Sequence, residues 1–251
     1  MKPVTIVIPY IMGPDNGLEL KYALRSIEKN FDHDNYTVIV IGDRPDWLIN
    51  VTHVPFTRLQ EGKYTAFKDQ ILKLYSVLTE FDVSENFIWT YDDVYFTSRV
   101  KLEDIVKPKA AKVVTKLEDI DLYTGGHNWK NCIKQAIADT GGKYVYETHL
   151  PRFYNKKKML QLMDHFKMLS KPTVIATLYY NYYSKGLSPI MINDNKDHFR
   201  FMIRSTFDVE RLEMLMRRAK FSNNNPNSYN LILKSVLEKL FPICSKFEAG
   251  R

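Results

Sequence analysis

The chain has 251 residues, of which 45% are hydrophobic, enough to form the core of one large α/β domain. Its formal net charge of +7 favours anionic ligands, such as a nucleotide diphosphate, an acidic membrane face or nucleic acid. No stretch has the apolar length of a transmembrane segment, and the short apolar run at residues 4–8 is followed by no signal-peptide cleavage site. We therefore expect a cytoplasmic protein without a transmembrane segment.

The first part of the chain alternates strand and helix patterns. Residues 4–10 are apolar throughout, which is typical of a buried parallel strand. Residues 18–30 carry an apolar stripe at helical spacing, and residues 36–41 repeat the strand pattern. This order predicts an α/β fold with a Rossmann-type, doubly wound, mostly parallel sheet flanked by helices, in which ligands bind at the carboxyl ends of the strands. Two candidate binding residues, Pro9 and Tyr10, end the first strand.

The rest of the chain continues with helices, short strands and polar loops. Helical patterns occupy residues 63–79, 156–165, 172–183, 209–218 and 228–240, and a short helix is expected between the glycine-containing loops at 124–128 and 140–143. Extended segments are expected at residues 87–91, 144–150 and 189–193, and a polar loop at 221–227. No repeat or low-complexity linker interrupts the chain, so we predict a single domain over residues 1–251.

Two adjacent carboxylates, Asp92 and Asp93, interrupt an apolar segment that runs from residue 87 to residue 96. Charged side chains in so apolar a stretch cost free energy unless a partner compensates them. A divalent cation is the usual compensation, because hard oxygen ligands suit Mg²⁺ or Mn²⁺, and such a cation also binds a diphosphate. A turn or a helix N-cap at the end of the strand is an equally good explanation of the pair. The aromatic neighbours favour metal binding, because they surround the acids with a poorly hydrated wall. They are Trp89, Tyr91 and Tyr95.

A second group of candidates, His149 and Arg152, lies around Pro151. With an unperturbed pKa near ~6.5, His149 is suited to act as a general base on an acceptor hydroxyl. It is also suited to complete the shell of a metal ion, and an ordinary surface or core histidine is the commoner case. Arg152 is a candidate for stabilising charge that develops on a phosphate, with a solvated surface arginine as the alternative.

Three further residues are candidates for contacts with a phosphorylated ligand. Asp43 follows the second strand, where it would accept hydrogen bonds from a ribose or a base, or simply form part of a turn. Arg25 and Lys63 are candidates for diphosphate contacts, or plain charges on helix surfaces. The loop at residues 13–17 lacks the glycine spacing of a dinucleotide fingerprint or a P-loop, which argues against NAD and against ATP bound in a P-loop.

Five blocks of the sequence resemble the Stealth proteins, which are sugar-1-phosphate transferases of bacterial capsule synthesis related to the lysosomal-enzyme GlcNAc-1-phosphotransferase. The blocks follow the order of that family and comprise residues 18–30, 38–48, 87–96, 147–152 and 240–248. The resemblance implies a GT-A-like fold, a UDP-sugar-type donor, and Mg²⁺ or Mn²⁺ as cofactor. It also implies that Asp92 and Asp93 bind the metal, that His149 lies at the reacting centre and that Arg25 lies near the donor.

The sequence also departs from the Stealth pattern. Tyr91 replaces the asparagine that precedes the two acids in the family. The family's late Asn-Asp pair is matched by a loop that offers Asn223, Asn224 and Asn225 but no acid, and Asn224 and Asn225 are the remaining site candidates.

These features together predict a metal-dependent transferase. We expect residues 1–100 to bind the nucleotide sugar and the metal, and residues 101–251 to bind the acceptor. The leading hypothesis is transfer of a sugar-1-phosphate from a UDP-sugar-type donor to an acceptor hydroxyl. The alternatives are conventional glycosyl transfer to a glycan or to a hydroxylated DNA base, with DNA less favoured, and a non-catalytic module that binds a sugar or nucleotide.

Overall fold

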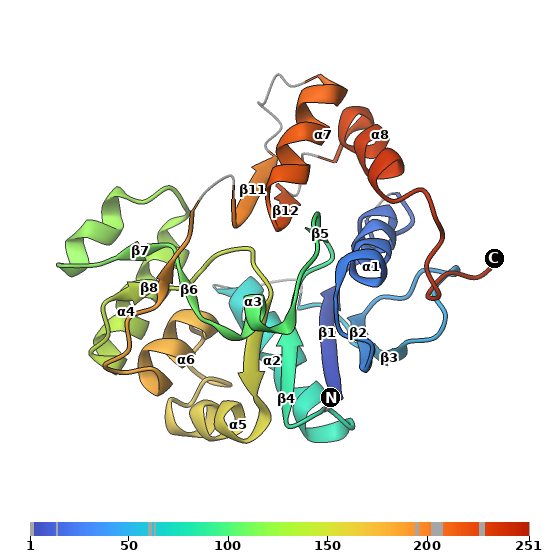
Figure 1. Ribbon diagram of the computed structural model, residues 1–251. Helices are drawn as coiled ribbons and strands as arrows, with labels where there is room; N and C mark the ends of the chain where they lie inside the picture. The colour runs from blue at the N-terminus through green and yellow to red at the C-terminus, as the bar shows by residue number, and fades with distance from the viewer. Residues whose placement is uncertain are drawn as a thin grey trace.

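A five-stranded sheet lies at the centre of the computed structural model, which describes residues 3–13, 15–59, 62, 64–193, 196–201, 208–225 and 229–250 (Figure 1). The sheet has the order β3-β2-β1-β4-β9, and all its neighbours are parallel except the antiparallel pair of β4 and β9. Its strands are β1 (Val4–Tyr10), β2 (Tyr36–Gly42), β3 (Thr52–Pro55), β4 (Asn86–Trp89) and β9 (Arg152–Asn155).

Helices pack around this sheet. They are α1 (Leu18–Asn30), α2 (Thr65–Glu80), α3 (Leu102–Val106), α4 (His127–Thr140), α5 (Lys156–His165), α6 (Ile175–Tyr183), α7 (Val209–Arg218), α8 (Leu231–Leu240) and the 3-10 helix η1 (Leu117–Leu122). None of the described helices combines the length and the apolarity needed to cross a membrane.

The two faces of the sheet are covered by different helices. Ile6 and Ile8 of β1 pack in one core cluster with Leu24 of α1, whereas Val7 packs in another with Leu74 of α2. Because side chains alternate across a strand, residues that are apolar at every position bury both faces. The predicted doubly wound sheet is therefore confirmed in its strand–helix–strand start, with α1 and α2 on opposite faces.

A second sheet, with the order β11-β12-β5, adjoins the first. Its strands are β5 (Val94–Phe96), β11 (His198–Phe201) and β12 (Phe221–Asn224). Strand β12 is parallel to β11 and antiparallel to β5, and α7 and α8 pack against this sheet and α1 in a third core cluster. Since β4 ends at residue 89 and β5 begins at residue 94, residues 90–93 form the turn that joins the two sheets.

Two pairs of short strands belong to the remaining part of the molecule, beside α4 and α6 (Figure 1). The parallel pair is β6 (Lys109–Ala110) with β10 (Ile190–Met191), and the antiparallel pair is β7 (Lys112–Val113) with β8 (Tyr144–Val145). This part is connected to the central sheet by β9, so both halves of the sequence contribute strands to one sheet.

Several sequence predictions need correction. The polar loop expected at residues 221–227 is wrong for residues 221–224, which form β12 with buried asparagines. Strands β3 and β9 were not predicted, because four residues at a sheet edge give too short a pattern. The helix between the glycine loops is not short, since α4 has 14 residues. The segment 144–150 forms a strand only at residues 144–145.

Candidate active site

The acid pair stands at the junction of the two sheets. Asp92 and Asp93 occupy the turn after β4, and the carboxyl ends of the parallel strands β1 and β2 lie at the same edge. The side chain of Asp93 is 15% exposed, so it is partly withdrawn from solvent. Within the described residues, neither carboxylate forms an ion pair with a lysine or arginine. The two acids therefore stand at the ligand-binding edge without a lysine or arginine ion pair from the described residues, and the charge of Lys73 is the smallest of the influences on the pKa of Asp92.

A third carboxylate, Glu19, reaches this pair from the first turn of α1. Burial, and after it the charges of Asp93 and Asp15, raise the pKa of Glu19 to about 7. Burial also raises the pKa of Asp92 well above its usual range, with additional contributions from the charges of Asp93 and Glu19. Sequence reasoning missed Glu19, although its position at the start of a helix that follows β1 was a usable signal.

Buried asparagines of β12 hold the carboxylates from the other side. Asn224 donates a hydrogen bond from Nδ2 to Oε1 of Glu19 at 2.5 Å and accepts one at Oδ1 from the hydroxyl of Tyr95 at 2.9 Å. Asn223 lies 3.4 Å from Oδ2 of Asp93 through its Nδ2. The structure thus connects the predicted Asn224 to the acid pair through Glu19, which was not predicted from the sequence.

His149 lies on the opposite side of Asp93. Its Nδ1 is 3.6 Å from Oδ1 of Asp93, and this nitrogen is buried without a hydrogen-bond partner. The side chain is nevertheless 43% exposed, so the rest of the ring faces solvent. Its centroid lies 5.0 Å from that of Tyr91. The structure therefore brings His149 and the acid pair together, with one ring nitrogen directed at Asp93 and the other available to a ligand.

Arg152 lies in the interior and not on the surface. It is 4% exposed, and its guanidinium donates to the carbonyl oxygens of Tyr146 and Thr148. The alternative of a solvated arginine is thus wrong, because β9 places the side chain in the interior. Contact with a substrate phosphate remains a prediction, while the observed hydrogen bonds show that Arg152 holds the turn that precedes His149.

The predicted residues at the ends of β1 and β2 form a small network. Tyr10 is buried, and its pKa is raised by burial and by the charges of Asp92 and Asp15. The carboxylate of Asp43 accepts a hydrogen bond from the backbone N–H of Met12 at 2.7 Å. Pro9 is paired with β2 and partly buried. Tyr10 therefore lies close enough to Asp92 for the charge of that acid to raise its pKa. Asp43 holds the start of the loop that follows Tyr10 through the backbone of Met12.

Of the remaining candidates, Arg25 binds the C-terminal segment and not the acid pair. Arg25 forms a two-pronged ion pair with Glu248, from Nε at 2.8 Å and from Nη2 at 2.6 Å, and it donates to the carbonyl of Phe241. This arrangement fastens the C-terminal segment to α1 and occupies the guanidinium. Asn225 follows β12 and accepts a hydrogen bond at its carbonyl from Asn224. Lys63 lies outside the described residues.

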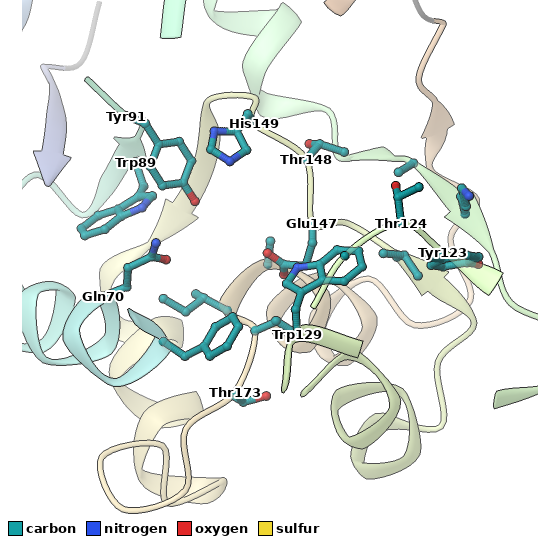
Figure 2. A pocket seen from close by; sticks show the side chains of 18 of the residues that line it. Gln70, Trp89, Tyr91, Tyr123, Thr124, Trp129, Glu147, Thr148, His149 and Thr173 are labelled. Atoms are coloured by element: carbon teal, nitrogen blue, oxygen red, sulfur yellow. The ribbon is translucent and has the colours of Figure 1, made fainter. Parts of the chain in front are cut away.

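A cavity of about 460 Å³ opens on the far side of His149 (Figure 2). Its walls come from α2, from the ends of β4 and β9 and from the region of η1, α4 and α6. Figure 2 shows that the Tyr91 hydroxyl, the Gln70 amide and the Glu147 carboxylate point into the same space, with the Trp129 indole beside Glu147. Sequence reasoning named Tyr91 as a neighbour of the acids but missed the other three.

The donor set of the site fits a divalent cation that shares its coordination with a ligand. Among the described residues, no group of three His, Cys, Asp or Glu side chains is close enough to hold a metal ion alone. Mg²⁺ is commonly bound by one or two carboxylates together with substrate phosphates. The acid pair matches that arrangement, because among the described residues neither carboxylate has a lysine or arginine partner, and Nδ1 of His149 lies beside Asp93 without a hydrogen bond.

Comparisons with known proteins concern the fold. No protein-family model matches the chain, and no curated protein matches its sequence. The chain is similar to the apo structure of the bifunctional glycosyltransferase WbbM, with a TM-score of 0.54 and 9% identity over 96% of this chain and 50% of that one. It thus spans half the length of the WbbM chain.

A second solved structure is a glycosyltransferase involved in the glycosylation of the major capsid of PBCV-1. It aligns with 96% of this chain and 100% of its own length at 10% identity and a TM-score of 0.42. The likeness to WbbM supports the predicted α/β fold with a mostly parallel central sheet, and at 9% identity it concerns the fold alone. The GT-A assignment and the Stealth resemblance stay predictions.

Proposed function

We propose that this protein is a metal-dependent nucleotide-sugar transferase. The observation that carries the proposal is the cluster of Asp92, Asp93 and Glu19 at the carboxyl edge of the sheet, where burial and mutual repulsion raise the pKa of two of the three acids. Such a cluster is unfavourable in the empty protein and becomes favourable once a divalent cation and its anionic ligand neutralise it. A cation bound there would stabilise charge on the departing phosphate.

The chain's own residues account for the remaining requirements. His149 presents one face to the cavity and directs Nδ1 toward Asp93, so its Nε2 is placed to accept the proton of an acceptor hydroxyl. The carboxylate of Asp93 lies 3.6 Å from Nδ1, on the other edge of the ring. Arg152 keeps the turn before His149 in place through two carbonyl oxygens. The buried Tyr10 and the loop held by Asp43 form the floor and edge of the expected nucleotide site.

Two outcomes of the transfer are chemically distinct. Attack of the acceptor oxygen on the anomeric carbon breaks the bond between that carbon and the donor phosphate oxygen, and a nucleoside diphosphate leaves. Attack on the β-phosphorus breaks the diphosphate instead, gives a phosphodiester, and releases a nucleoside monophosphate. The fold shared with WbbM favours the first outcome, whereas the Stealth resemblance favours the second. Identification of the released nucleotide, UDP or UMP for a UDP-sugar, decides between them.

The proposal is tested by a thermal-shift screen of nucleotide sugars with and without Mn²⁺, because a donor that binds only the native state raises the melting temperature. Asp93→Asn should lose the Mn²⁺-dependent shift and turnover while it keeps a cooperative melting transition. Asp82→Asn is the matched control, since Asp82 is exposed and precedes the opposite end of β4. Cation-independent turnover by Asp93→Asn would refute the site assignment.

A further inference from the structure

The cavity beside His149 has an aromatic wall that is held in a defined position. The loop glycine Gly125 has a positive φ of 143°, and a Cβ there would lie 2.7 Å from Cε3 of Trp129. The loop therefore packs directly on the indole, and any larger residue would displace it. The ring of Tyr123 is already covered by the ammonium of Lys112, 4.0 Å from its centroid. Trp129 is therefore a positioned aromatic surface for a ligand, and further aromatic side chains in the lining are Phe67, Trp89, Tyr91 and Tyr154.

Polar groups face this indole across the cavity. Oε1 of Glu147 accepts a hydrogen bond from the backbone N–H of Thr177 in the first turn of α6 at 2.9 Å, which fixes the carboxylate. Figure 2 shows the Tyr91 hydroxyl directed into the cavity, where a phenol can donate or accept a hydrogen bond. Figure 2 shows the Gln70 amide, which both donates and accepts, directed at the same space. The site thus combines one apolar face with several fixed hydrogen-bonding groups.

That combination matches the chemistry of a sugar ring. A pyranose has an apolar face of C–H groups that packs on an indole, and a rim of hydroxyls that donate to a carboxylate and exchange hydrogen bonds with an amide. The volume of about 460 Å³ lies within the range of about 300–1,000 Å³ for small-molecule sites. The lining carries charges of both signs, the carboxylate of Glu147 and the cationic side chains of Lys112 and Arg200, so it does not require a charged ligand.

We propose that this cavity binds a neutral pyranose ring of the acceptor and presents one of its hydroxyls to His149, a proposal that rests on the transferase function above. His149 connects the two regions, because it lines the cavity and also lies 3.6 Å from Asp93. The donor diphosphate belongs on the side of the acids and the nucleotide beyond them, toward β1 and β2. The acceptor therefore approaches His149 from the remaining side, between α2, α4 and α6.

The test uses saturation-transfer NMR with the full chain and methyl glycosides of glucose, galactose, mannose and N-acetylglucosamine as probes. We expect at least one probe to receive magnetisation at the C–H protons of one ring face. Trp129→Ala should weaken this signal at least fivefold, and Trp129→Phe should retain most of it. Gln70→Ala, in which no core side chain is removed, should also weaken binding. Tyr75→Ala is the control, because Tyr75 is 38% exposed on α2 outside the cavity.

Further measurements separate this proposal from the transferase function. A Mn²⁺-dependent donor shift that Trp129→Ala leaves unchanged supports an acceptor site, whereas a lost donor shift means that the cavity holds the donor sugar and overturns the proposal. Binding of no glycoside, while a donor still binds, also overturns it and leaves the transferase function standing. If a glycoside binds but none of the nucleotide sugars does, the acceptor role is overturned. Trp129-dependent binding of an oligonucleotide would show a nucleobase pocket instead.

Discussion

Replacing Glu19 with glutamine should stabilise the metal-free protein by an amount that grows with pH. Glutamine retains the oxygen that accepts the 2.5 Å hydrogen bond from Asn224 and removes the negative charge beside Asp93. The folded-state pKa of Glu19, about 7, is above its ordinary value of 4.5. Between these two pKa values the native state holds a proton that the unfolded chain releases. The contribution of protonated Glu19 to the free energy of unfolding therefore falls as pH rises from about 4.5, and it is fully lost above about 7.

The size of the effect follows from the two pKa values. The gap between 4.5 and about 7 corresponds to at most about 3 kcal/mol at pH 8 and about 1 kcal/mol at pH 5. Since Glu19 is partly exposed, solvent screening reduces both figures. For a chain of this length, about 1 kcal/mol shifts the melting temperature by roughly 2–4 °C. The Glu19→Gln variant should therefore melt up to roughly 6–12 °C above the wild type at pH 8, and much less above it at pH 5.

The assay is a pair of thermal melts at pH 5 and pH 8 in EDTA, repeated with Mn²⁺. Glu80→Gln serves as control, because Glu80 is exposed at the end of α2 and its change should stay within about 0.5 kcal/mol. If the proposed cation binds the acid cluster, Mn²⁺ should narrow or reverse the gap at pH 8 by stabilising the ionised wild type. An equal gain at both pH values, or a loss at pH 8, would show that Glu19 is not a buried, repelled carboxylate.

Two further predictions concern the scaffold. Arg25→Ala should cost about 2–3 kcal/mol in urea unfolding, because it removes two charge-assisted hydrogen bonds from the buried carboxylate of Glu248 and leaves it with Ser245 and the more distant Lys21; a loss below about 1 kcal/mol would mean that this ion pair does not fasten the C-terminal segment. Gly42→Ala should cost about 4 kcal/mol or more, since its φ is 129° and a Cβ would lie 1.9 Å from a carbonyl oxygen of β1. Gly141→Ala, also at positive φ but with nothing within 4 Å of the added Cβ, is the control that isolates the contact, and equal losses in the two variants would contradict it.

Local sequence pattern determined the first sheet strands, the helices α1 and α2, and the position of the acid pair. The almost continuous apolar run at 4–10 predicts a strand that is buried on both faces, and the apolar stripe at helical spacing in 18–30 predicts a helix that packs on one of them. Together they predict a parallel sheet covered on both faces. The polar residues Asp92 and Asp93 were conspicuous because so few charges occur in their segment. Such signals depend on neighbours in the sequence, and they can be read without the fold.

Only the tertiary structure decided which residues accompany the acids. Glu19 and Asn224 are 205 positions apart and meet because β12 pairs with β5, which follows the acid turn. The asparagines of β12 have the composition of a loop, and their burial depends on hydrogen-bond partners from distant elements. The cavity at Trp129 likewise needs α2, α4 and α6 to converge. Contacts of this kind arise from packing between elements, so no local periodicity in the chain encodes them.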